Sequence, residues 1–200
     1  MGYRTLLKLG PERIDYSAFK VEPCDIFFTR GYGFFSELIR IDESTWDDSK
    51  AVINHVGMVV NKGSLFTADA VEALAHVEKH TIYSQYHDHK DKIAIFRPIG
   101  LSLDDSQKII QKGLSYVGED YGYLKIFGHF LDYFTGGHYI FRRVFNNDNY
   151  PICSWVVAHA YKAADLNFGC DPGMANPDDI WDYCIKHPLQ YTKVFDLTKI

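Results

Sequence analysis

The apolar run from Ala51 to Val60 constrains the fold more than any other part of the sequence, because its residues are almost wholly apolar and rich in β-branched side chains. Such a run is typical of a strand that is covered on both faces in the middle of a sheet. His55 interrupts the run, and an imidazole is costly to bury unless it has a hydrogen-bond partner. The run therefore predicts a central strand that carries a partnered histidine. Two interpretations of His55 remain open at this point: a core histidine that bonds a backbone carbonyl, and a general base.

The remaining segments predict an α+β chain. Further strands and two helices are expected in this order: strands at 24–29, 64–70 and 92–97, helices at 102–118 and 151–166, and a last strand at 191–197. The strand at 64–70 follows a break at Asn61-Lys62-Gly63 and is the expected hairpin partner of the central strand. Strands that are mostly neighbours in sequence, with helices clustered later, favour an antiparallel sheet packed against helices over a βαβ alternation.

Composition narrows the class of protein. The chain has 200 residues, of which 46% are hydrophobic and 24% are charged, values typical of a globular domain with its own core. We expect a single domain over residues 1–200, with a peripheral N-terminal segment at about 1–21. A net charge of -5 offers no basic field for a phosphate backbone, which disfavours nucleic acid as a partner.

The sequence carries no signal for export and no membrane segment. It has neither the apolar region and cleavage site of a signal peptide nor an apolar window of about 18 residues. The four cysteines have no CxxC or zinc-like spacing, and without an export signal they are most simply reduced. We therefore expect a cytoplasmic protein with no integral membrane segment.

Cys153 is the first candidate for chemistry. It follows Pro151 in the first turn of the expected helix at 151–166. The N–H groups and the positive dipole end of a helix N-terminus favour a thiolate over a thiol, and they can also hold a developing oxyanion. The alternative interpretation is that Cys153 is a small apolar core residue.

A carboxylate on the returning strand is the expected partner of His55. If Asn61-Lys62-Gly63 is a three-residue hairpin loop, Val60 pairs with Ser64 and His55 then faces Asp69 across the two strands. Asp69 could fix the imidazole tautomer as the third member of a nucleophile, base and orienter set. A two-residue loop would put Asp69 on the other face, and Glu72 would share the face of His55 only in another register or with a bulge.

At these positions the chain resembles the circularly permuted papain-fold hydrolases, the YiiX/YaeF-like branch of the NlpC/P60 superfamily, which is related to lecithin:retinol acyltransferase-like proteins. The family pattern has a G-D-(I/L) strand, an H-V-G strand, a strand ending in E-A, a G-x-x-Y segment, a C-S-x-(L/V) helix start and a late P-x-D-(L/I) turn. The corresponding residues here are Cys24-Asp25-Ile26, His55-Val56-Gly57, Asp69-Ala70, Tyr121-Gly122-Tyr123 after Gly118, Cys153-Ser154-Trp155-Val156 and Pro177-Asp178-Asp179-Ile180. Cys24 departs from the usual glycine, and Asp69 stands where glutamate is common.

The resemblance implies a permuted papain-like fold and a cysteine-dependent hydrolase that acts on an amide or an ester. In that interpretation Cys153 is the nucleophile, His55 the base and Asp69 the orienter, and the reaction passes through an acyl-thioester without a cofactor. The substrate would be a small-molecule, peptide or lipid-like amide or ester. Two alternatives remain: an acyltransferase on lipid substrates, and a binding module that keeps the fold without turnover.

Two further features have a structural interpretation and a functional one. The histidines at 76, 80, 87 and 89, with Asp88, favour a solvated polar surface over a metal site, so no metal ligands are predicted. The aromatic stripe Tyr121–Phe134 favours plain core, while its density is also compatible with an apolar substrate wall near the nucleophile.

Overall fold

A computed structural model of the protein describes residues 7–9, 12–14, 17–30, 53–74, 76–86, 92–120 and 152–196. The aromatic stripe Tyr121–Phe134 and the residues His87, Asp88 and His89 lie outside the described residues.

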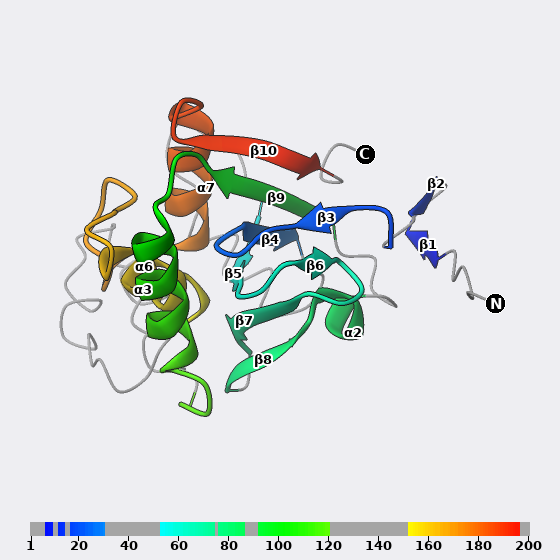
Figure 1. Ribbon diagram of the computed structural model, residues 1–200, viewed down its shortest axis with the longest axis horizontal. Helices are drawn as coiled ribbons and strands as arrows, with labels where there is room; N and C mark the ends of the chain where they lie inside the picture. Colours follow the sequence, from blue (N-terminus) through cyan, green and yellow to red (C-terminus); the bar gives the residue numbers. More distant parts are fainter. Residues whose placement is uncertain are drawn as a thin grey trace, which may run out of the picture.

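The described chain is organised around a six-stranded antiparallel sheet (Figure 1). From one edge to the other the strands are β10 (Tyr191–Asp196), β9 (Lys92–Pro98), β4 (Ile26–Arg30), β5 (His55–Val59), β7 (Asp69–Ala73) and β8 (Val77–Thr81). Two short pairs lie outside this sheet, namely β1 (Leu7–Leu9) with β2 (Glu12–Ile14) and β3 (Lys20–Val21) with β6 (Gly63–Ser64). The apolar run therefore does form an inner strand, with β4 on one side and β7 on the other.

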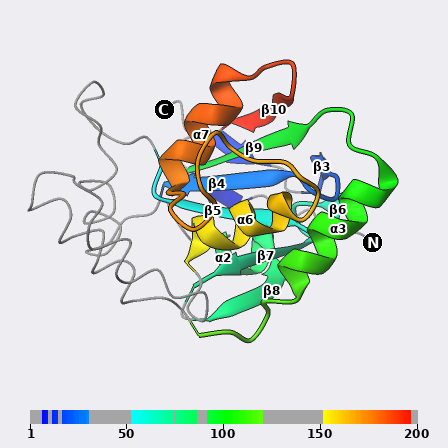
Figure 2. The same cartoon turned by 90° about the vertical axis from the view of Figure 1, so that its left-hand side faces the viewer.

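Helices cover both faces of the sheet. The helices are α2 (Ile82–Tyr86), α3 (Leu103–Leu114), α6 (Cys153–Lys162) and α7 (Pro177–Lys186). One buried cluster joins residues of α3, α6 and α7 to one face, including Val56 and Met58 of β5. A second cluster joins α2 and Leu65 to residues such as Phe27 and Val59, which alternate with the first set along the strands. Figure 2 shows α6, α3 and α7 in front of the sheet. The predicted α+β class, with an antiparallel sheet packed against helices, is confirmed.

The predicted hairpin register is wrong. Met58 pairs with Val71 and Val59 with Ala70, so β7 begins at Asp69 instead of at residue 64. Ser64 pairs instead with Lys20 of β3, a residue far away in the sequence. Between the two strands the chain makes an excursion that is held by the fully buried side chains of Leu65 and Ala68. A local loop rule cannot anticipate this excursion, because a distant segment stabilises it.

Candidate functional site

Cys153 is the first residue of α6 and is buried. Residue 152 at the N-cap is an isoleucine, which makes no capping hydrogen bond through its side chain. The helix is held in place by a nearly continuous run of buried side chains and by Ser154, whose Oγ donates to the carbonyl of Ala175 at 2.7 Å. The thiol therefore lies at the positive end of a firmly packed helix, as the sequence predicts.

His55, the first residue of β5, contacts the Cys153 thiol. Burial alone would raise the pKa of the Cys153 thiol, but the charge and hydrogen bond of His55, with backbone hydrogen bonds from Val56 and Ser154, hold that pKa below its ordinary value. Burial alone would lower the pKa of His55, yet Cys153 and Glu72 raise it to about 10. Both shifts favour the same state, a thiolate paired with an imidazolium.

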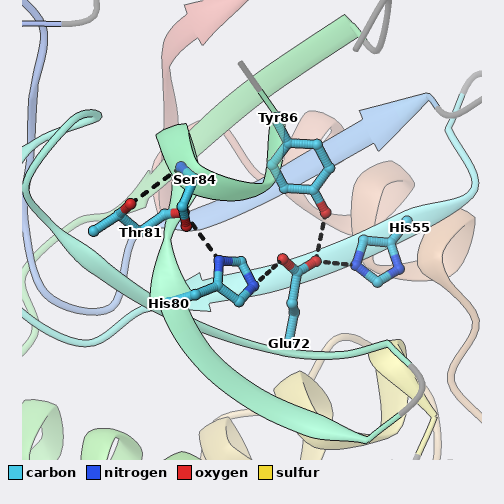
Figure 3. A network of polar contacts seen from close by, with 6 residues as sticks. All are labelled: His55, Glu72, His80, Thr81, Ser84 and Tyr86. Atoms are coloured by element: carbon cyan, nitrogen blue, oxygen red, sulfur yellow. Dashed lines mark hydrogen bonds and ion pairs between the residues drawn. The ribbon is translucent and has the colours of Figure 1, made fainter. Parts of the chain in front are cut away.

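Glu72 is the carboxylate that contacts His55. Its side chain is fully buried on β7, and its Oε2 accepts hydrogen bonds from His55 Nε2 and from the Tyr86 hydroxyl, the latter at 2.5 Å (Figure 3). His55 Nδ1 is then the ring nitrogen left for the thiol. Burial would raise the pKa of Glu72, but the charges and hydrogen bonds of His55 and His80 lower it to about 2. Glu72 is therefore an ionised carboxylate in a buried setting.

Asp69 has other partners, and its predicted contact with His55 is wrong. Its carboxylate accepts from Asn61 Nδ2 and from Lys79 Nζ, each at 3.0 Å. The Asn61 side chain also accepts from the Asp69 backbone N–H at 2.7 Å. Asn61 thus joins the end of β5 to the start of β7. This pairing fixes the register that brings Glu72, three residues after Asp69, to His55.

Gly57 makes the close approach of Glu72 possible. A Cβ atom at position 57 would lie 2.3 Å from Cζ of Phe27 and 2.9 Å from Cβ of Glu72, both too short for non-bonded carbon atoms. The glycine of the His55-Val56-Gly57 motif therefore leaves room for the Phe27 ring and for the Glu72 side chain, which reaches diagonally across to His55.

A sequence signal for Glu72 was present. The dipeptide Glu72-Ala73 matches the family's strand ending in E-A without substitution, whereas Asp69-Ala70 matches it only if aspartate replaces glutamate. Only the assumption of a three-residue loop favours Asp69, and the observed register removes that assumption.

The surroundings of the other three cysteines raise the pKa of each thiol and so disfavour the thiolate. Burial is the main cause that raises the pKa of Cys24 and of Cys170, each to about 11, and burial also raises the pKa of Cys184 well above its usual value. Among the four thiols, Cys153 alone has its pKa shifted downward.

The histidines His55 and His80 both contact Glu72, and their geometry bears on whether they could hold a metal ion. In the described part of the chain, no three His, Cys, Asp or Glu side chains are grouped so that they could hold a metal ion. His55 Nε2 and His80 Nε2 point to separate oxygens of Glu72 instead of toward a shared point. These residues therefore form a series of close polar contacts centred on Glu72.

Together, the fold and the site define a class: an antiparallel α+β protein in which a helix-terminal thiol, an imidazole and a buried carboxylate contact one another in series. A solved structure described as the metalloprotein YiiX from Escherichia coli O157:H7 has a similar fold, with a TM-score of 0.60 and 20% sequence identity over 88% of this chain and 97% of that one. The resemblance to the YiiX/YaeF-like branch is thus confirmed at the level of the fold. No family model and no curated protein matches the sequence. None of the described helices is long and apolar enough to cross a membrane.

Proposed function

We propose that the protein is a thiol hydrolase on a permuted papain-like fold, with Cys153 as nucleophile, His55 as general base and acid, and Glu72 as the orienter of His55. The observation that carries this proposal is the buried series Cys153, His55 and Glu72, which begins at the N-terminus of α6. The chain order of these residues, with His55 before Cys153, supports the permuted arrangement, as does the fold shared with YiiX.

The geometry suits acyl transfer to sulfur and then to water. The Cys153 thiolate attacks the carbonyl carbon of an amide or ester, and the oxyanion that forms accepts a hydrogen bond from the backbone N–H of Cys153. His55 gives its proton to the leaving amine or alcohol, which leaves a thioester on Cys153 and a neutral imidazole. A water molecule then attacks the thioester carbonyl and passes a proton to His55. Release of the acid restores the thiolate and the imidazolium.

Glu72 acts on the base and not on the substrate. Its hydrogen bond to Nε2 keeps Nδ1 directed at the sulfur, and its negative charge stabilises the imidazolium in the resting state. The substrate class is an amide or ester with a peptide or lipid-like acyl group.

The first prediction tests Cys153 directly. Activated 4-nitrophenyl esters and the matching 4-nitroanilides should be hydrolysed with a burst, and mass spectrometry should find the acyl group on Cys153. Cys153→Ala should abolish both the burst and the adduct. Cys170→Ala, at a half-buried thiol with a raised pKa, should leave them unchanged.

Three outcomes decide the proposal. Turnover that survives in Cys153→Ala, or an adduct on another residue, would contradict it. Loss of wild-type turnover after treatment with EDTA, restored by a divalent metal, would also contradict a mechanism that relies on these side chains alone. An acyl-enzyme that reacts with added amine or alcohol acceptors but not with water would replace hydrolysis by acyl transfer.

A further inference from the structure

His80 lies behind Glu72, on the side away from His55. It belongs to the edge strand β8, where it pairs with Ala70 of β7, and its side chain is 14% exposed. Its Nε2 is 2.6 Å from Oε1 of Glu72, and its Nδ1 is 2.9 Å from the carbonyl oxygen of Thr81 (Figure 3). Glu72 is therefore enclosed between two imidazoles, one at each carboxylate oxygen.

Both partners of the His80 ring are hydrogen-bond acceptors. A neutral imidazole carries one N–H and would have to turn its lone pair toward one of these oxygens, whereas an imidazolium donates to both. The Thr81 carbonyl is itself held in place, because it also accepts from Ser84 Oγ at 2.7 Å. Two acceptors around one ring, one of them a carboxylate at 2.6 Å, therefore favour a protonated His80.

The charges around Glu72 alternate in sign. Glu72 faces the cations His55 and His80 and the neutral hydroxyl of Tyr86, and Glu78 on β8 is a second carboxylate that acts on His80. The buried series starts with the negative Cys153 thiolate and continues with positive His55, negative Glu72 and positive His80. The net charge of these four groups is zero. Removing the His80 charge would leave this series with a net negative charge in a buried setting, where an uncompensated charge is costly.

We infer that His80 is a positioning residue: as an imidazolium it anchors Oε1 of Glu72, keeps this carboxylate ionised and directed at His55, and so favours the thiolate form of Cys153. The catalytic meaning of this inference rests on the proposed function. The anchoring itself concerns the resting protein and can be measured without a substrate.

The test is the pH dependence of Cys153 alkylation. Full-length wild type, His80→Ala and His80→Gln are reacted with iodoacetamide from about pH 4 to pH 10, and the rate at Cys153 is followed by peptide mass mapping. Both variants should raise the midpoint pH of alkylation by roughly one unit, because neither side chain carries a charge. Gln keeps a donor and most of the side-chain volume, so it separates loss of charge from loss of packing.

A matched control is available on the same edge of the molecule. His76 also contacts a carboxylate, with its Nδ1 2.9 Å from Asp120, but both side chains are more than half exposed. His76→Ala should give an alkylation profile that superimposes on that of wild type. A shift in His76→Ala equal to that in the His80 variants would overturn the inference, since any loss of an imidazole would then have the same effect.

A double-mutant cycle tests whether His80 acts through Glu72. Glu72→Gln should raise the midpoint by itself, and adding His80→Ala to it should produce little further change. Independent, additive shifts would mean that His80 acts on Cys153 by another route, and the positioning role would be wrong.

The same data separate the inference from the proposed function. A wild-type midpoint near the ordinary thiol pKa of 9.0 would contradict the proposed function. A low wild-type midpoint that rises in Glu72→Gln but not in either His80 variant would overturn the role of His80 alone. With a turnover assay, the His80 variants should lower kcat and leave KM unchanged.

Discussion

Asp69 and Glu72 are two carboxylates on one strand, and their surroundings give them different roles. Glu72 is fully buried between His55, His80 and Tyr86, whereas Asp69 has 27% of its side chain exposed and contacts Asn61 and Lys79. In the proposed function the buried Glu72 orients His55, whereas the partly exposed Asp69 at the strand end fixes the register of β5 and β7.

A pair of isosteric variants tests this difference. Glu72→Gln should lower kcat/KM by roughly 10- to 10⁴-fold, the range expected when the orienting partner of a catalytic imidazole loses its charge. Asp69→Asn should change kcat/KM by less than about threefold, because the amide can still bond Asn61. The measurement is hydrolysis of one activated ester by both proteins. Equal losses in the two variants would show that the strand as a whole, and not the carboxylate at 72, sets the rate.

The polar residues of the site could be predicted to the extent that they interrupt apolar segments. His55 and Cys153 stood out because each is placed in an otherwise apolar element, and the structure brings the two together. Glu72 was only a reserve candidate, because its position depends on the strand register. His80 could not be selected from its neighbours in a polar stretch, since nothing local shows which histidine faces a buried carboxylate.

At the scale of elements, prediction succeeded where a strand or helix buries an apolar face. Strands β5 and β10 and helices α3 and α6 lie within the expected segments, and strands β4 and β9 each extend one residue beyond theirs. The edge strand β8 and helices α2 and α7 were missed, and at 177–180 only a turn was expected. Strand β8 reads Val-Glu-Lys-His-Thr, and its outer residues are polar. An edge strand pairs on one side only and needs few apolar residues. Such a strand is therefore easier to predict from the strand it pairs with than from its own composition.

Gly57 of β5 lies between Phe27 of β4 and Glu72 of β7, and this close packing supports a prediction at the scale of elements. Gly57→Ala should destabilise the protein by about 1–3 kcal/mol, because the fully buried Phe27 ring cannot move away from the added methyl group. The same methyl group would displace Glu72 and lower esterase activity. Gly100→Ala is the control: its φ is +76° and nothing lies within 4 Å of the added atom, so it should cost about 1 kcal/mol at full activity. Chemical denaturation measures the stability of the two variants, and the ester assay measures their activity. An active Gly57→Ala variant of normal stability would show that the backbone there can yield.

At the scale of the whole molecule, the site links stability to pH through the number of protons it holds. In the ion pair proposed for the folded protein, Cys153 and His55 share one proton, on the imidazolium. In the unfolded chain the pair also holds one proton between the ordinary pKa of His55, 6.5, and that of Cys153, 9.0, but there the proton is on the thiol. Equal proton numbers mean that the pair adds no slope to stability between pH 6.5 and 9.

Outside this range the signs differ. Below pH 6.5 the unfolded chain binds the extra proton, so stability falls as the pH falls. Glu72 adds to this loss: its folded pKa of about 2 is below its ordinary 4.5, so its contribution is present above pH 4.5 and is lost between 4.5 and 2. Above pH 9 the unfolded thiol ionises while the folded imidazolium still holds its proton, and stability falls again.

Cys153→Ser turns this reasoning into a measurement, because serine keeps the shape and removes the thiolate. In this variant burial still acts to lower the pKa of His55, and Glu72 still acts to raise it. We expect Glu72 to prevail, so that the stabilising contribution of His55 is present below pH 6.5 and is lost as the pH rises through the pKa of the folded imidazolium. Between pH 6.5 and 9 the variant should therefore lose stability relative to wild type, with a slope on the order of 1 kcal/mol per pH unit. Urea unfolding of both proteins at half-unit intervals gives the difference directly, and shifts shared by both, such as that of His80, cancel. A difference that stays constant across this range would mean that His55 is neutral in the folded variant, so that Glu72 alone does not keep the buried imidazole charged.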